Sequence, residues 1–112
     1  GQLESVLGEW DAGLCPVSAT PAFDHRRPAT KLPGEPIEVV GQKLPYWVAA
    51  ISYKTVFNLT GNPVVVLPVA RSGVGMPIGV QVVGKKWEDM RLLGMAERLA
   101  EVTGPFQRPP GY

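Results

Sequence analysis

Two apolar runs in the second half of the chain constrain its fold more than any other feature. Residues 64–67 and 78–83 are rich in β-branched side chains, and a glycine-rich turn over residues 71–75 lies between them. A crossover between parallel strands needs a dozen or more residues, so the short connection predicts an antiparallel hairpin near residues 64–83. The first run does not alternate apolar with polar residues, which is typical of a strand covered on both faces.

Helical spacing predicts three further elements. A single helix over residues 46–59 would place four residues on one face, at steps of four, four and three: Trp47, Ile51, Thr55 and Asn58. A C-terminal helix near residues 88–103 begins at Glu88 and Asp89, ends at Gly104, and carries one apolar stripe: Leu92, Leu93, Ala96, Leu99 and Ala100. The end of another helix precedes Gly13 and is indicated by Leu3, Val6, Leu7 and Trp10.

The rest of the first half is less regular. Residues 14–17 are a short apolar run that suits a buried strand, which Pro16 and Pro21 end. Residues 24–43 are predicted to be a long irregular excursion, in which only Ile37, Val39 and Val40 suggest a brief extended pairing. An irregular stretch of about twenty residues is uncommon in a compact domain, so it indicates either disorder or a segment lying over a larger body.

Composition limits the classes of function. The chain has 112 residues, a formal net charge of +1 and scattered basic residues, which favours one domain and argues against a nucleic-acid partner. One cysteine and one histidine offer no metal-ligand cluster, and a lone cysteine fits the reducing cytoplasm. The longest apolar run, around residues 64–70, is too short to cross a bilayer, so we expect no membrane partner.

The predicted elements do not balance one another. Two buried strands and a third short one need helices on both faces, whereas the chain supplies two full helices and part of a third. Part of the apolar surface is therefore expected to belong against sequence outside this chain. Alone, such a piece would expose apolar surface and self-associate through it or through free strand edges.

Three blocks of the second half resemble the closing segment of the amidase-signature hydrolases. They are FNLTGNPVVVLP over residues 57–68, GMPIGVQVVG over residues 75–84 and DMRLL over residues 89–93. The first half is similar to the family in Asp11, in Pro16 after a short apolar strand, and in Thr20 and Pro21 at its exit. Because RPP at residues 108–110 also resembles the family's common ending, the likeness covers nearly the whole chain from residue 1 to 112.

The resemblance implies the C-terminal portion of an α/β/α layered fold with a mixed sheet, and a parent enzyme that hydrolyses carboxylic amide C–N bonds. The family's catalytic set is a serine nucleophile, a second serine on a cis peptide, and a lysine acting as base through that serine. The stretch that carries this set lies outside the chain, so no catalytic residue is expected here. The resemblance further implies no cofactor or metal, a small-molecule amide substrate, and the missing N-terminal part of the same enzyme as partner.

The resemblance also suggests which residues border the substrate channel. In the family the helix matching residues 46–59 lies beside that channel, and the turn near residues 74–76 approaches it. The candidate substrate-pocket residues are therefore Trp47, Ile51, Thr55, Asn58, Val74 and Met76, although the helical four equally suit ordinary core packing. Glutamine-using relatives tend to have an acidic residue near this turn, whereas Val74 stands at the matching place, which favours an apolar or aryl amide.

Two alternatives remain open from the residues. A free-standing, noncatalytic interaction module derived from an amidase tail would be stable and monomeric by itself. An independent small hydrolase would use Ser52 or Ser72, but Lys54 is two residues from Ser52 on a helix and faces elsewhere, and Ser72 has no nucleophile-elbow sequence. Gln81, a polar residue inside an apolar strand, is expected to satisfy a neighbouring loop backbone.

Overall fold

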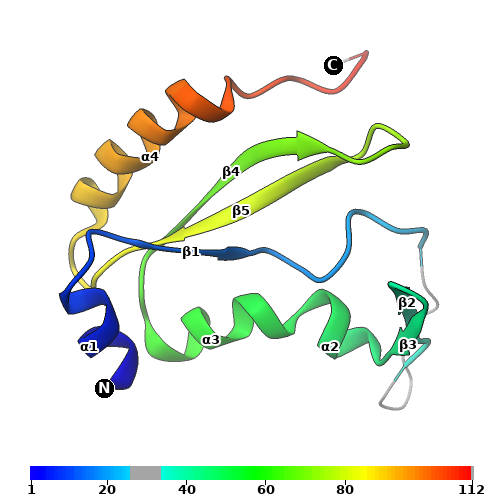
Figure 1. Cartoon of the computed structure of the whole chain (residues 1–112), viewed down its shortest axis with the longest axis horizontal. Helices are drawn as coiled ribbons and strands as arrows, with labels where there is room; N and C mark the ends of the chain where they lie inside the picture. The colour runs from blue at the N-terminus through cyan, green and yellow to red at the C-terminus, as the bar shows by residue number, and fades with distance from the viewer. Residues whose placement is uncertain (26–33, 112) are drawn as a thin grey trace.

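Figure 1 shows a computed structural model of the chain, which describes residues 1–25 and 34–111. Its elements, in chain order, are α1 (Gln2–Gly8), β1 (Gly13–Pro16), β2 (Ile37–Val39), β3 (Gln42–Leu44), α2 (Tyr46–Ala50), α3 (Ser52–Thr60), β4 (Val64–Arg71), β5 (Pro77–Val83) and α4 (Asp89–Thr103). Strands β4 and β5 form the hairpin predicted near residues 64–83, and α4 matches the helix predicted near residues 88–103. The α/β class is confirmed.

A three-stranded sheet in the order β1-β5-β4 forms the centre of the molecule. Val82 of the central strand β5 lies opposite Leu14 in β1 and opposite Val65 in β4. A bulge between Pro68 and Ala70 shifts the β4–β5 register near the hairpin turn. All pairings between described strands are antiparallel, so the parallel pairings of the mixed sheet implied by the resemblance are not found among these strands.

Helix α4 covers one face of this sheet (Figure 1). Leu67 and Val82 pack there against Leu92 and Ala96, and each of these four side chains is 9% exposed or less. Partly buried residues complete this core: Ala12, Val65, Val80, Met95, Leu99 and Ala100. The stripe predicted for this helix is correct except at Leu93, which is 48% exposed.

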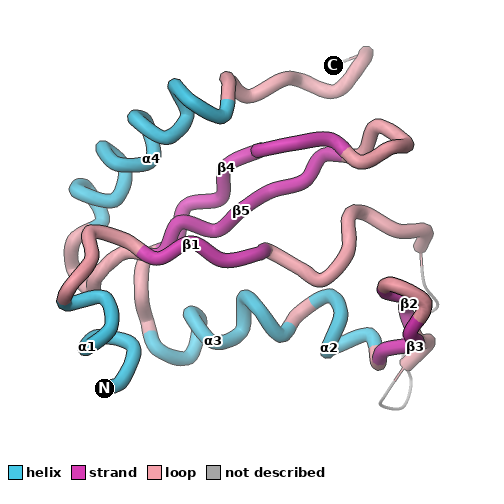
Figure 2. The backbone as a smooth tube through the Cα atoms, viewed as in Figure 1, coloured by secondary structure: helices cyan, strands magenta, loops and turns pink. Residues whose placement is uncertain are grey.

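The opposite face of the sheet is only partly covered. Helices α2 and α3 run along this side (Figure 2), yet no residue of α3 is buried. Val66, opposite Gln81 on this face, is 53% exposed, so the expectation of cover on both faces is wrong for this chain by itself. Leu14 in the edge strand β1 is 62% exposed because α4 packs mainly on β4, so the expected buried strand over residues 14–17 is also wrong.

The single helix predicted over residues 46–59 is broken into two. Helix α2 ends at Ala50 and α3 begins at Ser52, with Ile51 between them at φ −121° and ψ −32°. The carbonyl of Ala49 accepts a hydrogen bond from the backbone N–H of Ala19 at 2.9 Å. A helix carbonyl that binds a neighbouring loop weakens the helical hydrogen-bond ladder at that turn, which accounts for the break.

Residues 34–44 are more regular than an excursion. Strands β2 and β3 form a short hairpin, which confirms the brief pairing at Ile37 and Val39, whereas Val40 lies in the turn at φ 49°. Ile37 is 2% exposed and packs against Ala49 and Ala50 in a second, smaller core. The predicted excursion also includes residues 26–33, which lie outside the described residues.

The N-terminal helix joins one end of the sheet. Leu7 is its buried member, whereas Val6 is 62% exposed and Trp10 lies beyond the end of α1. Asn62, just before β4, is 7% exposed, and its Nδ2 donates to Glu4 Oε1 at 2.8 Å and to the Gly84 carbonyl at 3.0 Å. This amide therefore ties α1 to the start of β4 and the end of β5.

Candidate functional site

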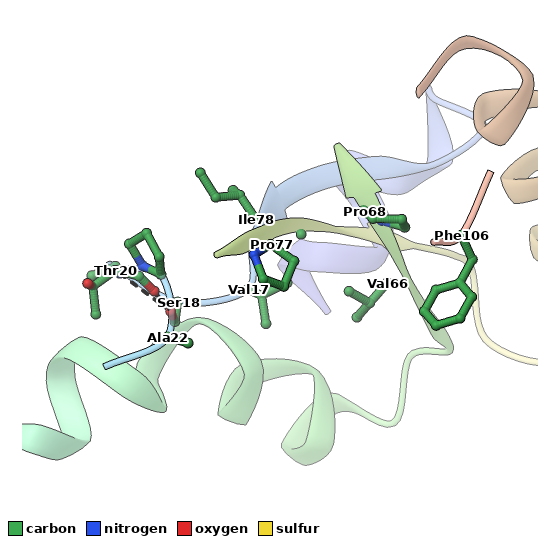
Figure 3. A pocket seen from close by; sticks show the side chains of 12 residues that line it. Val17, Ser18, Thr20, Ala22, Val66, Pro68, Pro77, Ile78 and Phe106 are labelled. Atoms are coloured by element: carbon green, nitrogen blue, oxygen red, sulfur yellow. Dashed lines mark hydrogen bonds between the residues drawn. The ribbon is translucent and has the colours of Figure 1, made fainter. Parts of the chain in front are cut away.

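Two adjoining cavities lie next to the sheet. The first is bordered by the loop that follows β1, and both are bordered by residues near the β4–β5 turn. The first measures about 550 Å³ and is lined by Val17, Ser18, Ala19, Thr20, Pro21, Ala22, Val66, Pro68, Pro77, Ile78, Gly79 and Phe106. In Figure 3, Thr20 and Phe106 lie at its opposite ends. The second measures about 630 Å³, lies along the C-terminal tail, and shares Pro68, Pro77 and Phe106 with the first.

The loop over residues 17–22 forms one wall of the first cavity, and its own polar groups hold it in place. The hydroxyl of Ser18 donates to the carbonyl of Thr20 and accepts from the Thr20 N–H at 3.4 Å. The N–H of Ala19 donates to the carbonyl of Ala49 in α2 at 2.9 Å. The wall is thereby anchored to the helix beside it.

Gln81 anchors the start of the same loop to the central strand. This side chain is 3% exposed, and its Nε2 donates to the carbonyl of Pro16 at 2.8 Å. The same nitrogen lies 3.3 Å from Cys15 Sγ and 3.4 Å from the Tyr53 carbonyl in α3. The prediction that Gln81 satisfies a neighbouring loop backbone is confirmed, and one buried amide links β1, β5 and α3.

Gly79 forms part of the cavity floor. A Cβ atom at this position would lie 3.0 Å from Val66 Cγ1 and 3.5 Å from Val17 Cγ2. The absence of a side chain at Gly79 therefore lets β4 and the loop after β1 approach each other. Any larger residue would occupy space between two cavity-lining valines.

The predicted pocket residues are spread over two regions. Met76 lines the second cavity, and Val74 is 88% exposed at the tip of the neighbouring turn. Trp47, Ile51, Thr55 and Asn58 lie along α2, α3 and the break between them, and line neither cavity. Trp47 is 52% exposed and Ile51 37% exposed, so this face is not packed in the core of the described residues.

Sequence reasoning missed the loop over residues 17–22 as a wall. Its signal was present as small and proline residues directly after a short apolar strand, but the position of that strand beside β5 depends on a contact between residues 65 positions apart, Gln81 with Pro16. Periodicity within one segment carries no information about such a contact.

The hydroxyl groups proposed as alternative nucleophiles are engaged with the backbone. Ser52 Oγ donates to the carbonyl of Val48, one helical turn earlier. Ser72 Oγ accepts from the Met76 N–H at 3.1 Å within the β4–β5 turn. Lys54 is exposed on α3, so it does not supply the buried lysine that such chemistry would need beside Ser52.

Cys15 also lacks the environment of a reactive thiol. Burial raises the pKa of its thiol above the ordinary value, and the hydrogen bond from Gln81 opposes this only in part. Reactive cysteines instead have a lowered pKa, because the thiolate is the nucleophile. Among the described residues no group of three or more potential metal-binding side chains gathers, and no helix is long and apolar enough to cross a membrane.

Comparison with known proteins identifies the family. The Amidase family matches residues 2–93, which is most of the chain. The chain belongs to the amidase family. The match includes β1, helices α2 and α3, and the β4–β5 hairpin.

Amidase relatives and an amidase crystal structure agree with this assignment. A glutamyl-tRNA(Gln) amidotransferase polypeptide of Treponema pallidum (strain Nichols) is 32% identical over 79% of this chain and 15% of its own length. Putative amidase AmiB2 of Mycobacterium tuberculosis (strain CDC 1551 / Oshkosh) is 29% identical over 97% of this chain and 22% of its own length. A crystal structure of an amidase superposes with a TM-score of 0.74 and 34% identity, covering 92% of this chain and 22% of that chain.

These amidase relatives are much longer than the chain. It spans 15% to 22% of the length of the three proteins compared. The agreement in structure is not confined to one element, because the superposition covers 92% of the chain.

Proposed function

We propose that this chain is the C-terminal segment of an amidase that hydrolyses carboxylic amide C–N bonds, with its serine, cis-peptide serine and lysine outside residues 1–112. Residues 1–112 form the C-terminal segment of one amidase domain. This segment completes the sheet of that domain and contributes part of its substrate channel. The missing N-terminal part of the same enzyme is its partner, and the parent enzyme acts on a small-molecule amide in the cytoplasm, where a lone cysteine stays reduced.

The half-open sheet face carries this proposal. Val66 in β4 is 53% exposed, and the neighbouring helix α3 has no buried residue. The chain nevertheless belongs to a family whose compared members are much longer. A monomeric soluble protein rarely exposes a large contiguous apolar patch. Cover by the remainder of an amidase, of which this chain would be about one fifth or less, accounts for both observations.

The engaged hydroxyl groups support the absence of catalysis within this chain. Ser52 and Ser72 both serve the backbone, and the Cys15 thiol has a raised pKa. In the proposed parent enzyme a neutral lysine accepts the proton of the nucleophile through the bridging serine, and backbone amides stabilise the oxyanion. This chemistry requires no metal or cofactor.

The exposed candidates have a role in the same proposal. Trp47 and Ile51 on α2 and at its end, with Thr55 and Asn58 on α3, would form one wall of the channel once the remaining chain covers them. Val74 and Met76 would approach it from the β4–β5 turn. All of them except the half-buried Thr55 are exposed, which supports contact with substrate or with the missing part more than it supports core packing.

Intact mass set against the open reading frame is the first test. A reading frame that extends upstream through a lysine and a Gly/Ser-rich stretch supports the proposal. The 112-residue chain should then neither hydrolyse an amide series nor react with a fluorophosphonate, whereas co-expression with the upstream part should restore both activities.

Two results would contradict this proposal. Labelling of the isolated chain at Ser52 or Ser72 would favour an independent hydrolase. A reading frame that begins with this segment, combined with a monomeric and stable chain in analytical ultracentrifugation, would favour the noncatalytic interaction module instead.

A further inference from the structure

We propose that Trp10, Trp87 and Met90 form a docking surface for the upstream part of the parent enzyme. We call this surface the tryptophan corner. It rests on the proposed function, because its partner is the missing part of the same enzyme. It lies at the end of the sheet where the chain leaving α1 runs beside the beginning of α4 (Figure 1), and it does not include the half-open face at Val66 and α3.

One arginine holds the three segments of the tryptophan corner together. Arg91, in the first turn of α4, pairs through Nη2 with Asp11 at 2.8 Å and through Nη1 with Glu88 at 3.1 Å. Each of the three apolar residues directly precedes a member of this ion-pair cluster in the chain. The three therefore lie at one place on the molecule, although Asp11 and Arg91 are 80 positions apart.

The side chains of the corner are open to solvent. Trp10, Trp87 and Met90 are 66%, 94% and 80% exposed. A single exposed apolar residue needs no partner, whereas three of them gathered around one ion-pair cluster give an apolar centre with a charged rim, which is typical of a protein interface. Tryptophan is also among the residues that contribute most to binding when a partner covers them.

The backbone at Trp87 is strained. The Glu88 N–H donates to the Lys85 carbonyl at 3.2 Å and closes a turn, in which Trp87 takes the third position with φ 67°. Glycine or asparagine is usual at a turn position with positive φ, because a larger side chain crowds the backbone there. Since Trp87 is almost fully exposed, its ring makes little contact within the described chain that could offset this strain. Burial of the ring against a partner would offset it.

Length and position favour the upstream part as the occupant of the corner. The chain spans 15% to 22% of the length of the compared relatives, so most of a parent enzyme of that size lies outside it. In the proposed parent that part joins at Gly1, and α1 lies at the same end of the molecule as the corner (Figures 1 and 2). A covalent link beside the corner raises the effective concentration of the upstream part there.

The test uses Trp87→Gly and a control with the same backbone change. Val40 also has a positive φ, 49°, and is 98% exposed, but it lies in the turn between β2 and β3, on the opposite side of the molecule (Figure 1). Glycine relieves the strain at both positions, so neither variant should lower the Tm of the 112-residue chain in circular dichroism. If Trp87→Gly alone lowered this Tm, the ring would serve the fold of the chain itself, which would overturn the docking role.

Association is measured with a split enzyme, in which a tagged upstream part from the same reading frame binds the 112-residue chain. Trp87→Gly should raise the Kd about tenfold or more in biolayer interferometry, whereas Val40→Gly should leave it unchanged. Oxidative footprinting should find Trp87 and Met90 protected in the full-length enzyme relative to the isolated chain. Equal Kd values for the two variants, or equal oxidation of Trp87 in both proteins, would overturn the docking surface. A dimer of the isolated chain that depends on Trp87 would assign the corner to a second copy and overturn it as well.

Amide hydrolysis by the split enzyme separates this proposal from the proposed function. An active split enzyme whose association does not depend on Trp87 overturns the docking surface and leaves the proposed function intact. Association that depends on Trp87, in a complex that hydrolyses no amide, overturns the proposed function and leaves the docking surface intact. A reading frame without an upstream part overturns both.

Discussion

Replacement of Leu92 by alanine should cost more stability than any other truncation on α4. Leu92 is 1% exposed and packs against Leu67, Val82 and Ala96. A Cβ at Gly84 would lie 3.1 Å from Leu92 Cδ2, so its nearest neighbours include a glycine and an alanine, which have no long side chain to move into the vacated space. Because the cavity would persist, we expect a loss of about 3 to 4 kcal/mol.

Leu93→Ala is the matched control on the same helix. Leu93 is 48% exposed, so water already reaches its side chain and truncation leaves no closed cavity. Its loss should be about 1 kcal/mol or less. Urea unfolding followed by circular dichroism measures both values, and Leu92→Ala should also lower Tm by on the order of 15 °C.

Two outcomes would refute the reasoning about α4. If Leu93→Ala destabilised the chain as much as Leu92→Ala, the assignment of Leu92 and not Leu93 to the sheet-facing side of α4 would be wrong. If Leu92→Ala cost less than about 1.5 kcal/mol, the surrounding core would be loose enough to collapse around the missing atoms.

Three further predictions concern the sheet. Gly84→Ala should destabilise the chain by about 1 to 3 kcal/mol in urea unfolding, because its Cβ would overlap Leu92, whereas Gly8→Ala meets nothing within 4 Å and should not. Gln81→Glu should destabilise more at pH 8 than at pH 4, because a carboxylate would face the carbonyls of Pro16 and Tyr53, and equal unfolding curves would contradict this. Burial raises the pKa of the Cys15 thiol, so with rising pH the unfolded chain loses the thiol proton before the folded chain does. The free energy of unfolding should therefore fall as pH rises above about 8.5. Cys15→Ala should remove this dependence of stability on pH.

Local periodicity predicted the elements whose environment is set within one segment. The α4 stripe repeats at helical spacing, and the short turn after β4 permits only a hairpin, so both follow from neighbouring residues. Leu93 was misjudged because it lies at the flank of the predicted stripe, next to the buried Leu92, and is 48% exposed. Met95, outside the predicted stripe, packs against the core instead.

Distant contacts decided the features that the sequence did not predict. The break at Ile51 coincides with the hydrogen bond from Ala19 to Ala49, and those two residues are 30 positions apart. Val66 is exposed because no described residue beside α3 covers it, and the sequence of β4 cannot indicate that such cover is absent. Strand periodicity indicates that a residue prefers burial, whereas the partner that buries it can lie anywhere in the folded enzyme.

Gln81 and Leu92 therefore separate stability from cavity geometry. Leu92 contributes to the core under α4, on the sheet face away from the loop over residues 17–22, so its truncation should lower stability without moving the cavity wall. Gln81 faces the other side and holds the carbonyl of Pro16, directly before that wall. A Gln81 variant should consequently shift the backbone NMR signals of residues 17–22 by more than an equally destabilised Leu92 variant, and equal shifts would mean that the signals report only the folded fraction.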